Sequence, residues 1–400
     1  MKRMIMGFII LSIILSPVSA VDWPMFHGGP EHTGFLEEPS DFAPHTWTIK
    51  IGPVKGSLAI FNKVAYIGSL DGKIYAINLE DGMILWDYKT GGDIVSSPAI
   101  KNGTLFIGSM DGYLYAMDTK TGELKWKFKT GNSIESSPAV SNDTVYIGSN
   151  DCRVYAIDIE TGGKKWDLYL GDSIKSSPIL VNDTLYVAAT NGRLYAVGTV
   201  NGTEIWNYTT GDAIYSTPAF YNGMVYVASN DGNLYAFNGS DGTMEWKYNL
   251  GNKVYSSPTI DEKDNSLFIG SDNGNFTCLD TRDGQLKWSY QTGGPIRSTP
   301  ALFNNLVAFG SDDGTLYILN KYSGKEEWKF SPGYYLFNSP IRSSPVVYGK
   351  TIYFASENGY LYSVDSEKKE GPTPVFAYYL LGISIILVGV IIGIRILRSR

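Results

Sequence analysis

Hydrophobic and polar residues alternate along short runs of this chain. In one run, Leu124, Trp126 and Phe128 share one face of an extended segment and the intervening lysines share the other, as a half-buried β-strand requires. Asn-Gly, Asp-Gly and Thr-Gly pairs separate the runs, and such pairs are typical of tight hairpin turns. The pattern therefore predicts short antiparallel strands that follow one another along the chain.

Four such runs form a unit of about forty residues that the chain repeats. In one unit we predict strand A at 97–100, strand B at 104–108, strand C at 113–117 and strand D around Trp126. Eight units begin with related Ser-Ser-Pro or Gly-Ser segments, at Gly56, Ser96, Ser136, Ser176, Ser216, Ser256, Ser298 and Ser343. Four-stranded units restated around a closed ring are the signature of a β-propeller.

The eighth unit ends at Asp365 without the Gly-x-x-x-Trp segment of a strand D. A matching strand stands near the start of the chain, around Trp47. We therefore predict an all-β fold in which residues 44–365 form an eight-bladed β-propeller of four-stranded antiparallel blades. The N-terminal strand would close blade eight and remove the free sheet edges.

Both ends of the chain carry targeting and membrane signals. Residues 1–20 combine two basic residues, an apolar run and a small-residue end, which predicts a secretory signal peptide; an uncleaved N-terminal anchor is the alternative. Residues 375–394 are uncharged and long enough for one transmembrane helix, and the arginines in 395–400 predict a cytoplasmic tail. The propeller, its leader 21–43 and the linker 366–374 would then lie outside the cell membrane on a single span, unless the tail is processed.

One segment of the repeat resembles a known family. The Ala-x-Asp-x-x-Thr-Gly-x-x-x-Trp sequence at 116–126, repeated with variations in other units, is similar to the tryptophan-docking motif of pyrroloquinoline-quinone (PQQ)-type propeller repeats. The resemblance spans residues 22–365. It implies that a structural tryptophan stacks between neighbouring blades, at Trp47, Trp86, Trp126, Trp166, Trp206, Trp246, Trp288 and Trp328. The family contains both quinone dehydrogenases and non-catalytic scaffolds, such as the propeller lipoprotein of the outer-membrane assembly machinery, so fold alone does not decide activity.

Charge and cysteine content exclude several classes of function. Between the terminal segments lie 28 basic and 40 acidic residues, a net charge of −12, which argues against a nucleic-acid partner. Cys152 and Cys278 fall in blades three and six, too far apart in the ring to pair. The vicinal cysteine pair often carried by quinone dehydrogenases is absent from the sequence.

The residue just before each Ser-Ser-Pro varies, while its neighbours recur. In a four-stranded meander the D–A and B–C connections share one face, so these residues should surround the mouth of the central channel. They are Lys55, Val95, Glu135, Lys175, Tyr215, Tyr255, Arg297 and Arg342, and the matching B–C positions are Leu70, Met110, Asn150, Thr190, Asn230, Asp272, Asp312 and Glu357. A longer loop before blade eight adds the aromatic residues Tyr334, Tyr335 and Phe337. We name this set the funnel and predict that it binds an anionic or extended partner; solvated loop tips without a ligand are the alternative.

The A–B and C–D connections share the opposite face. Five Asn-x-Ser/Thr sequons fall there and are candidate N-glycosylation sites, or chance matches in Asn- and Thr-rich turns: Asn102, Asn142, Asn182, Asn201 and Asn238. An acidic insertion at 261–266 and the histidines His27, His32 and His45 suit solvated turns and a packed leader better than metal ligation, so no metal site is predicted.

Two functions fit this pattern. The first is a membrane-anchored extracytoplasmic scaffold that binds a protein, peptide or glycan through the funnel and needs no cofactor. The alternative, implied by the resemblance, is a PQQ-dependent alcohol or sugar dehydrogenase that would also require calcium. Its site would draw on Arg297, Arg342, Asp272, Asp312, Glu357 and Asn338. The scaffold is favoured because blades one to five lack the long insertions that build a cofactor pocket in such dehydrogenases.

Overall fold

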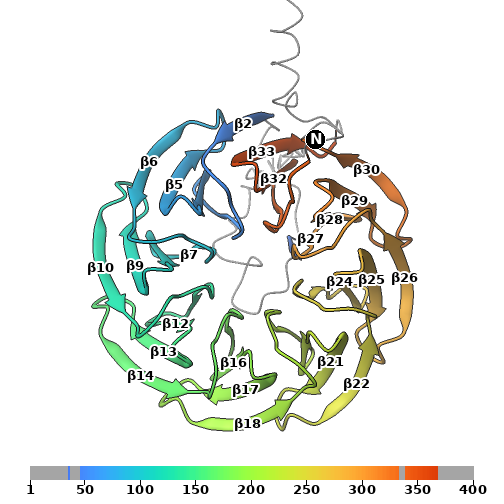
Figure 1. Ribbon diagram of the computed structural model, residues 1–400, viewed down its shortest axis with the longest axis horizontal. Coiled ribbons are helices and arrows are strands. Elements are labelled where there is room, and N and C mark those ends of the chain that lie inside the picture. The colour runs from blue at the N-terminus through green and yellow to red at the C-terminus, as the bar shows by residue number, and fades with distance from the viewer. Residues whose placement is uncertain (1–34, 37–45, 333–337, 368–400) are drawn as a thin grey trace, which may run out of the picture.

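The computed structural model describes residues 35–36, 46–332 and 338–367, and every regular element in these ranges is a β-strand. Eight antiparallel sheets stand around a central channel (Figure 1). The predicted eight-bladed all-β propeller is therefore confirmed. The predicted signal peptide and the stretch at 375–394 lie outside the described residues. Within the ranges described, no helix has the length and apolar character needed to span a membrane.

Within each blade, strand A lies next to the channel, strand D lies at the rim, and strands B and C lie between them. In the first half of the ring they are β3 (Ala59–Phe61), β4 (Val64–Gly68), β5 (Lys73–Asn78) and β6 (Ile84–Lys89) in blade one; β7 (Ala99–Lys101), β8 (Thr104–Gly108), β9 (Tyr113–Asp118) and β10 (Leu124–Lys129) in blade two; β11 (Ala139–Val140), β12 (Thr144–Gly148), β13 (Arg153–Asp158) and β14 (Lys164–Tyr169) in blade three; and β15 (Ile179–Val181), β16 (Thr184–Ala188), β17 (Arg193–Gly198) and β18 (Glu204–Thr209) in blade four.

The second half repeats the same order. Its strands are β19 (Ala219–Tyr221), β20 (Met224–Ala228), β21 (Asn233–Asn238) and β22 (Met244–Asn249) in blade five; β23 (Thr259–Asp261), β24 (Ser266–Gly270), β25 (Asn275–Asp280) and β26 (Leu286–Gln291) in blade six; β27 (Ala301–Phe303), β28 (Leu306–Gly310), β29 (Leu316–Asn320) and β30 (Glu326–Phe330) in blade seven; and β31 (Val346–Tyr348), β32 (Thr351–Ala355) and β33 (Tyr360–Asp365) in blade eight.

Blade eight obtains its outer strand from the start of the chain. Strand β2 (Trp47–Lys50) pairs antiparallel with β33, placing Trp47 opposite Ser363 and Lys50 opposite Tyr360. This is the predicted closure. It ties the two ends of the propeller together through main-chain hydrogen bonds, so the ring opens only if this ladder breaks.

One short strand was not predicted. Strand β1 (Phe35–Leu36) pairs in parallel with β27, so blade seven has a fifth strand on its inner side. A two-residue strand has no alternation by which to recognise it, and the inner edge of every strand A leaves unpaired main-chain groups toward the channel. Residues 35–36 thus occupy a sheet edge inside the ring.

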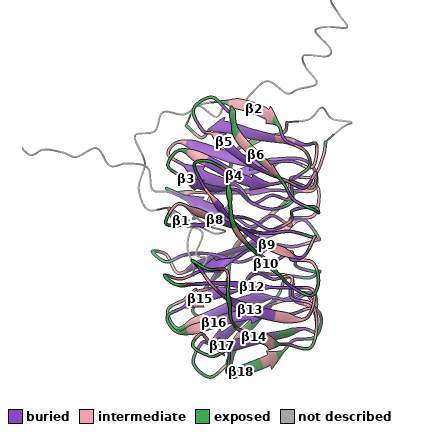
Figure 2. Ribbon diagram, turned by 90° about the vertical axis from the view of Figure 1, so that its left-hand side faces the viewer, coloured by how far each residue is buried: buried purple, intermediate pink, exposed green. Residues whose placement is uncertain are grey.

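Strands B and C supply most of the core, and strand D covers the rim. In blade two, four consecutive central residues of β9 are buried, whereas β10 alternates between exposed and partly buried residues. The inner strands are accordingly purple and the rim strands pink and green in Figure 2. This difference explains why the alternation in the sequence is clearest in strand D: a strand buried on both faces is apolar throughout.

The repeated tryptophans join each blade to the next one. The indole Nε1 of Trp126 donates to the carbonyl oxygen of Ile159 in blade three at 3.1 Å, and its ring lies against Gly162, which has φ +71°. Six other tryptophans make the same bond to the following blade: Trp47, Trp86, Trp166, Trp206, Trp246 and Trp288. The Nε1 of Trp328 has no partner among the described residues.

Candidate partner-binding funnel

The D–A and B–C connections meet on one face, as predicted. The main-chain N–H of Met110 donates to the carbonyl of Asp93 at 2.8 Å, and Asn150 makes the same bond to Ser133 at 2.9 Å. Each B–C turn is therefore held against the connection that leads into its own blade. This contact fixes the positions of the variable side chains around the channel.

A recurring aspartate strengthens this face, a role that the sequence did not reveal. The Asp111 carboxylate accepts hydrogen bonds from Tyr115 Oη at 2.6 Å and from the main-chain N–H of Gly91 at 2.8 Å. Burial alone would raise the pKa of Asp111, but the bonds from Tyr115, Tyr113 and Gly91 outweigh it and lower the pKa. The bond from tyrosine recurs at Asp71, Asp151, Asp231 and Asp313, so the aspartate at this position of the B–C turn is structural and does not belong to the variable set.

Six of the funnel residues line one cavity at the channel mouth, whereas Glu135, Lys175 and the B–C positions are not part of its lining. The cavity has a volume of about 140 Å³ and is lined by Lys55, Val95, Tyr215, Tyr255, Arg297 and Arg342, among others. Their common location follows from the repeat, because equivalent positions of all blades point to the same axis. Tyr334, Tyr335 and Phe337 lie outside the described residues, so their predicted role as anchors stays a prediction.

Below these side chains lies a ring of hydroxyl groups, at positions for which the sequence predicted only the start of strand A. The N–H of Ser97 donates to Ser137 Oγ at 2.9 Å, and the same bond links Ser57 to Ser97 at 2.8 Å. Near the closure, Ser57 Oγ donates to the carbonyl of Ser344 at 3.0 Å. The side chains that line this part of the cavity are Ser57, Ser97, Ser137, Ser177, Thr217, Ser257, Thr299 and Ser344. A partner that enters the funnel meets a polar floor.

Ion pairs between blades fill one sector of the funnel. Arg297 donates from Nε and Nη2 to the two carboxylate oxygens of Asp272, at 2.9 and 3.0 Å. Arg342 holds Asp312 in the same way at 2.9 Å for both bonds, and its Nη1 reaches Glu357 at 3.1 Å. These hydrogen bonds, led by those to the aspartates, raise the pKa of both arginines. The cations of this sector are therefore already compensated.

In blades three to six, the funnel side chains make polar and aromatic contacts with one another. Glu135 accepts a bond from Asn150 Nδ2 at 2.8 Å and lies 3.1 Å from Lys175 Nζ. The rings of Tyr215 and Tyr255 lie with centroids 5.1 Å apart, and the guanidinium carbon of Arg297 is 5.0 Å from the Tyr255 centroid, within range of a cation–π contact. Two buried acceptors, the Oδ1 atoms of Asn150 and Asn230, have no partner in the described part of the chain.

Blades one and two make a different sector. Leu70 and Val95 are partly buried, and Met110 is 40% exposed. Lys55 is exposed, and no carboxylate of a described residue lies within ion-pair distance of it. The funnel therefore has a compensated polar sector and an apolar sector with one uncompensated cation. With four basic and four acidic side chains its charge is balanced, which does not favour a strongly anionic partner.

The remaining predicted site residues are not brought into this cavity. Asn338 donates from Nδ2 to the carbonyl of Asp313 at 3.1 Å. Cys152 and Cys278 are free, as expected from their separation. Asn102, Asn142, Asn182 and Asn201 are exposed and Asn238 is partly buried, and the histidines lie outside the described residues.

The acidic insertion of blade six holds a cation from its own chain. Lys321, buried in the C–D turn of blade seven, contacts the buried carboxylate of Asp261, and its Nζ lies 3.9 Å from Asp264. The ammonium group of Lys321 thus lies at the insertion that the sequence analysis weighed for metal ligation. In the ranges described, no cluster of three His, Cys, Asp or Glu side chains is arranged to hold a metal ion.

The fold, the docked tryptophans and the closed ring define a PQQ-like β-propeller. The chain belongs to the family described as beta-alanine-activating enzyme, beta-propeller, whose model matches residues 141–374. A second model, described as outer membrane protein assembly factor BamB, matches residues 41–179. No curated protein matches the sequence.

Solved structures share the architecture at low sequence identity. BamB from Moraxella catarrhalis is 20% identical with a TM-score of 0.69, over 80% of this chain and 99% of that one. The quinohemoprotein alcohol dehydrogenase ADHIIG from Pseudomonas putida HK5 is 14% identical with a TM-score of 0.74, over 89% and 82%. The computationally designed protein Ika8 is 18% identical with a TM-score of 0.69, over 78% and 98%. These similarities establish the fold only.

Proposed function

We propose that this protein is a non-catalytic scaffold that binds an extended segment of a protein partner in the funnel. The observation that carries the proposal is the cavity at the charge-balanced channel mouth, whose floor is a ring of hydroxyl groups. Hydroxyl groups both donate and accept hydrogen bonds, so this floor can pair with the main-chain groups of an extended peptide. Tyr215 and Tyr255 add aromatic area of the kind enriched at protein interfaces.

The two sectors suggest what the partner segment looks like. An apolar side chain would lie on Leu70, Val95 and Met110, and a carboxylate of the partner would approach Lys55. The balanced charge disfavours a polyanion, because the other cations already hold carboxylates. BamB, named as an outer membrane protein assembly factor, offers a parallel for a partner-binding propeller of this fold.

A quinone dehydrogenase is the less favoured function. The cavity of about 140 Å³ is below the ~300 Å³ at which small-molecule sites usually begin. The arginines expected to reach quinone oxygens are engaged with Asp272, Asp312 and Glu357, so neither of these two guanidinium groups is free. These contacts favour a scaffold over a site for PQQ with calcium. Saturable PQQ binding that Arg297→Ala abolishes would reverse this preference.

Photo-cross-linking tests the scaffold function. A photoreactive amino acid at Tyr255 in the full-length chain should form a defined adduct in cells that express it. The same group at Tyr322, 60% exposed in a C–D turn on the opposite face, is the matched control. The Tyr255 adduct should be lost in Lys55→Glu, because a glutamate at position 55 would repel the partner carboxylate that Lys55 is proposed to attract. Equal adducts from both positions, or none from Tyr255, would exclude a partner in the funnel.

We propose further that the funnel faces outward from the cell membrane, held by residues 375–394. This proposal rests on the charge and hydropathy pattern of the sequence alone. Cys152 provides a direct test, because it is a partly exposed free thiol in a B–C turn of the funnel face. A membrane-impermeant maleimide should label it in intact cells; labelling only after lysis would place the propeller inside.

A further inference from the structure

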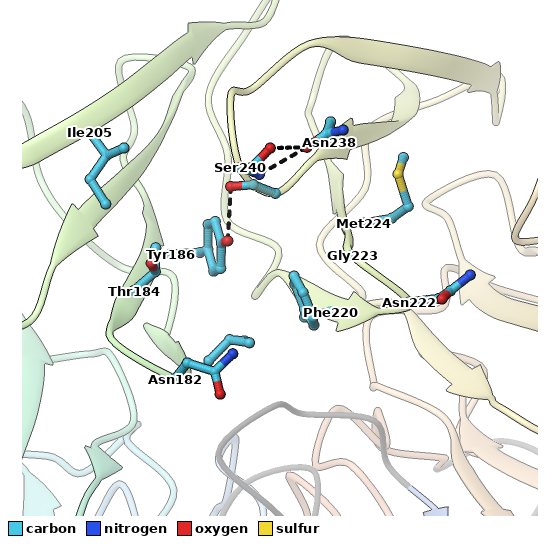
Figure 3. Close-up of a pocket in the computed structure, with 12 residues that line it drawn as sticks. Asn182, Thr184, Tyr186, Ile205, Phe220, Asn222, Gly223, Met224, Asn238 and Ser240 are labelled. Atoms are coloured by element: carbon cyan, nitrogen blue, oxygen red, sulfur yellow. Dashed lines mark hydrogen bonds between the residues drawn. The ribbon is translucent and has the colours of Figure 1, made fainter.

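A second cavity lies on the opposite face, between blades four and five (Figure 3). Its volume is about 440 Å³, within the range of ordinary small-ligand sites. The A–B turns of both blades and the C–D turn of blade five surround it. We propose that this cavity binds a neutral pyranose unit of a saccharide, an inference that is independent of the funnel.

Three sequence features of blades four and five create this space. In blades two, three and six a lysine of strand D donates to the hydroxyl at the start of strand B, as Lys125 does to Thr104 Oγ1 at 2.8 Å. Blade four has Ile205 at this position, 54% exposed. Thr184 Oγ1 therefore makes no hydrogen bond to another described residue, and the turn remains open.

The other two features are in blade five. Phe220 occupies a strand-A position that is aliphatic in all seven other blades, and its ring stacks on Tyr186 with centroids 5.9 Å apart and planes 20° apart. Gly239 occupies the turn position that carries Thr119 or a larger side chain in most other blades. A Cβ there would lie 2.9 Å from Phe220 Cε2 and 2.9 Å from Tyr186 Oη. The phenylalanine and the glycine are thus sterically coupled.

The chemistry of the lining indicates the ligand class. No acidic or basic side chain is among the residues that surround the cavity, so a charged ligand would find no counter-ion. The amides of Asn182 and Asn222 are without a hydrogen bond in the part of the chain described, and Asn238 uses only its Oδ1, which accepts two bonds from Ser240 at 2.7 and 2.9 Å. Amides and hydroxyls beside an aromatic ring match the hydroxyl rim and C–H face of a pyranose.

The saccharide has two sources with the same chemistry. It is either a free or partner-borne glycan, or a glycan attached to this chain, because the sequons that begin at Asn182 and Asn238 both border the cavity. In the first arm of the test, full-length protein from cells without N-glycosylation is titrated calorimetrically. The probes are methyl α-D-glucopyranoside, methyl α-D-mannopyranoside and N-acetylglucosamine, in a detergent without a sugar headgroup.

The decisive variant introduces into blade four the lysine–hydroxyl bond of blades two, three and six. Ile205→Lys should let the ammonium reach Thr184 and weaken saccharide binding by at least about tenfold, whereas Leu85→Lys, the same change at the equivalent position of blade one, should leave binding unchanged. Gly239→Ala should weaken binding as well. Because lysine is native at this position in three blades, Ile205→Lys should keep the melting temperature of the parent, so lost binding is not lost folding.

In the second arm, protein from glycosylating cells is mapped for glycans, and hydrogen exchange of residues 219–224 is measured before and after enzymatic glycan removal. If glycan removal raises the hydrogen exchange of residues 219–224 in the parent protein but not in Ile205→Lys, the cavity binds the chain's own glycan. Binding in the first arm assigns it to an external saccharide. No binding of any probe together with no change in exchange, or binding that Ile205→Lys does not alter, overturns the proposal.

Discussion

The guanidinium of Arg342 bonds both carboxylate oxygens of Asp312, which belongs to the preceding blade. The Asp312 side chain is only 11% exposed, and its other basic neighbour, Arg297, lies 3.8 Å away. The pair therefore joins blades seven and eight at the funnel while it sets the charge of the channel mouth. Stability and recognition share the same side chains here.

Arg342→Ala should lower the free energy of unfolding by about 1–3 kcal/mol, because it leaves Asp312 largely desolvated without its main partner. The value is below that of a fully buried pair since Arg342 is 28% exposed. Urea denaturation measures it. Lys63→Ala, which removes an exposed pair with Glu80, is the control and should change stability by no more than about 0.5 kcal/mol. Similar losses in both variants would contradict a special role for the funnel pair.

The tryptophan docking predicts a difference between two glycines. Gly162→Ala places a Cβ 2.7 Å from Trp126 Cδ2 at a position with φ +71°, so strain and clash add to about 2–4 kcal/mol. Gly223→Ala has a similar φ of +79° but no atom within 4 Å, so it isolates the strain, about 1 kcal/mol. Thermal and urea unfolding of both variants give the comparison. Equal losses of unfolding free energy in the two variants would mean that the Trp126 ring moves aside without a cost in stability.

The buried pair between blades six and seven should behave as a coupled unit. Lys321→Met leaves the fully buried Asp261 carboxylate without its ammonium partner, which should cost about 3–5 kcal/mol. Adding Asp261→Asn to this variant should recover at least half of the loss, because the uncompensated charge is gone. A double-mutant cycle from urea denaturation measures the coupling. Simple additivity of the two substitutions would show that the groups do not interact.

The sequence was sufficient for the architecture. Trp126 and its seven equivalents specify eight blades. The period-two pattern of strand D and the turn pairs specify four strands in each blade. The closure follows from Trp47, whose strand precedes blade one and matches the strand D that blade eight lacks. Strand β1 was out of reach, because Phe35 and Leu36 pair through main-chain groups and show no side-chain pattern. The membrane span and the glycosylation of the sequons remain predictions.

The candidate sites were predictable only in part. The variable position before Ser-Ser-Pro placed Arg297 and Arg342 at the channel mouth, but not their pairing with Asp272 and Asp312. Each arginine and the aspartate that it binds come from neighbouring blades. Only the geometry of the ring therefore decides which aspartate each arginine contacts. The cavity at Gly239 left a readable signal, an aromatic and a glycine that both depart from the repeat, but their contact joins strand A to a distant turn of the same blade.

The structural aspartates predict how stability depends on pH. The pKa values of Asp111 and Asp231 are lowered in the folded protein, where burial is outweighed by hydrogen bonds from Tyr115 or Tyr235 and from main-chain N–H groups. A folded pKa below the unfolded value of about 3.9 means that the unfolded chain binds protons more readily. The stabilisation is therefore complete above that value and is lost as the pH falls toward the folded pKa.

Asp111→Asn isolates this contribution, because asparagine is native at the equivalent position in blades four, six and eight, as at Asn191, and should fit without strain. We expect a loss of about 1 kcal/mol at pH 7, since the carboxylate accepts stronger bonds than an amide does but is partly exposed. The gap to the parent should shrink as the pH falls below about 4. Urea unfolding at pH 7, 5 and 3 measures it. A gap that stays constant over this range would show that the charge of Asp111 does not stabilise the turn.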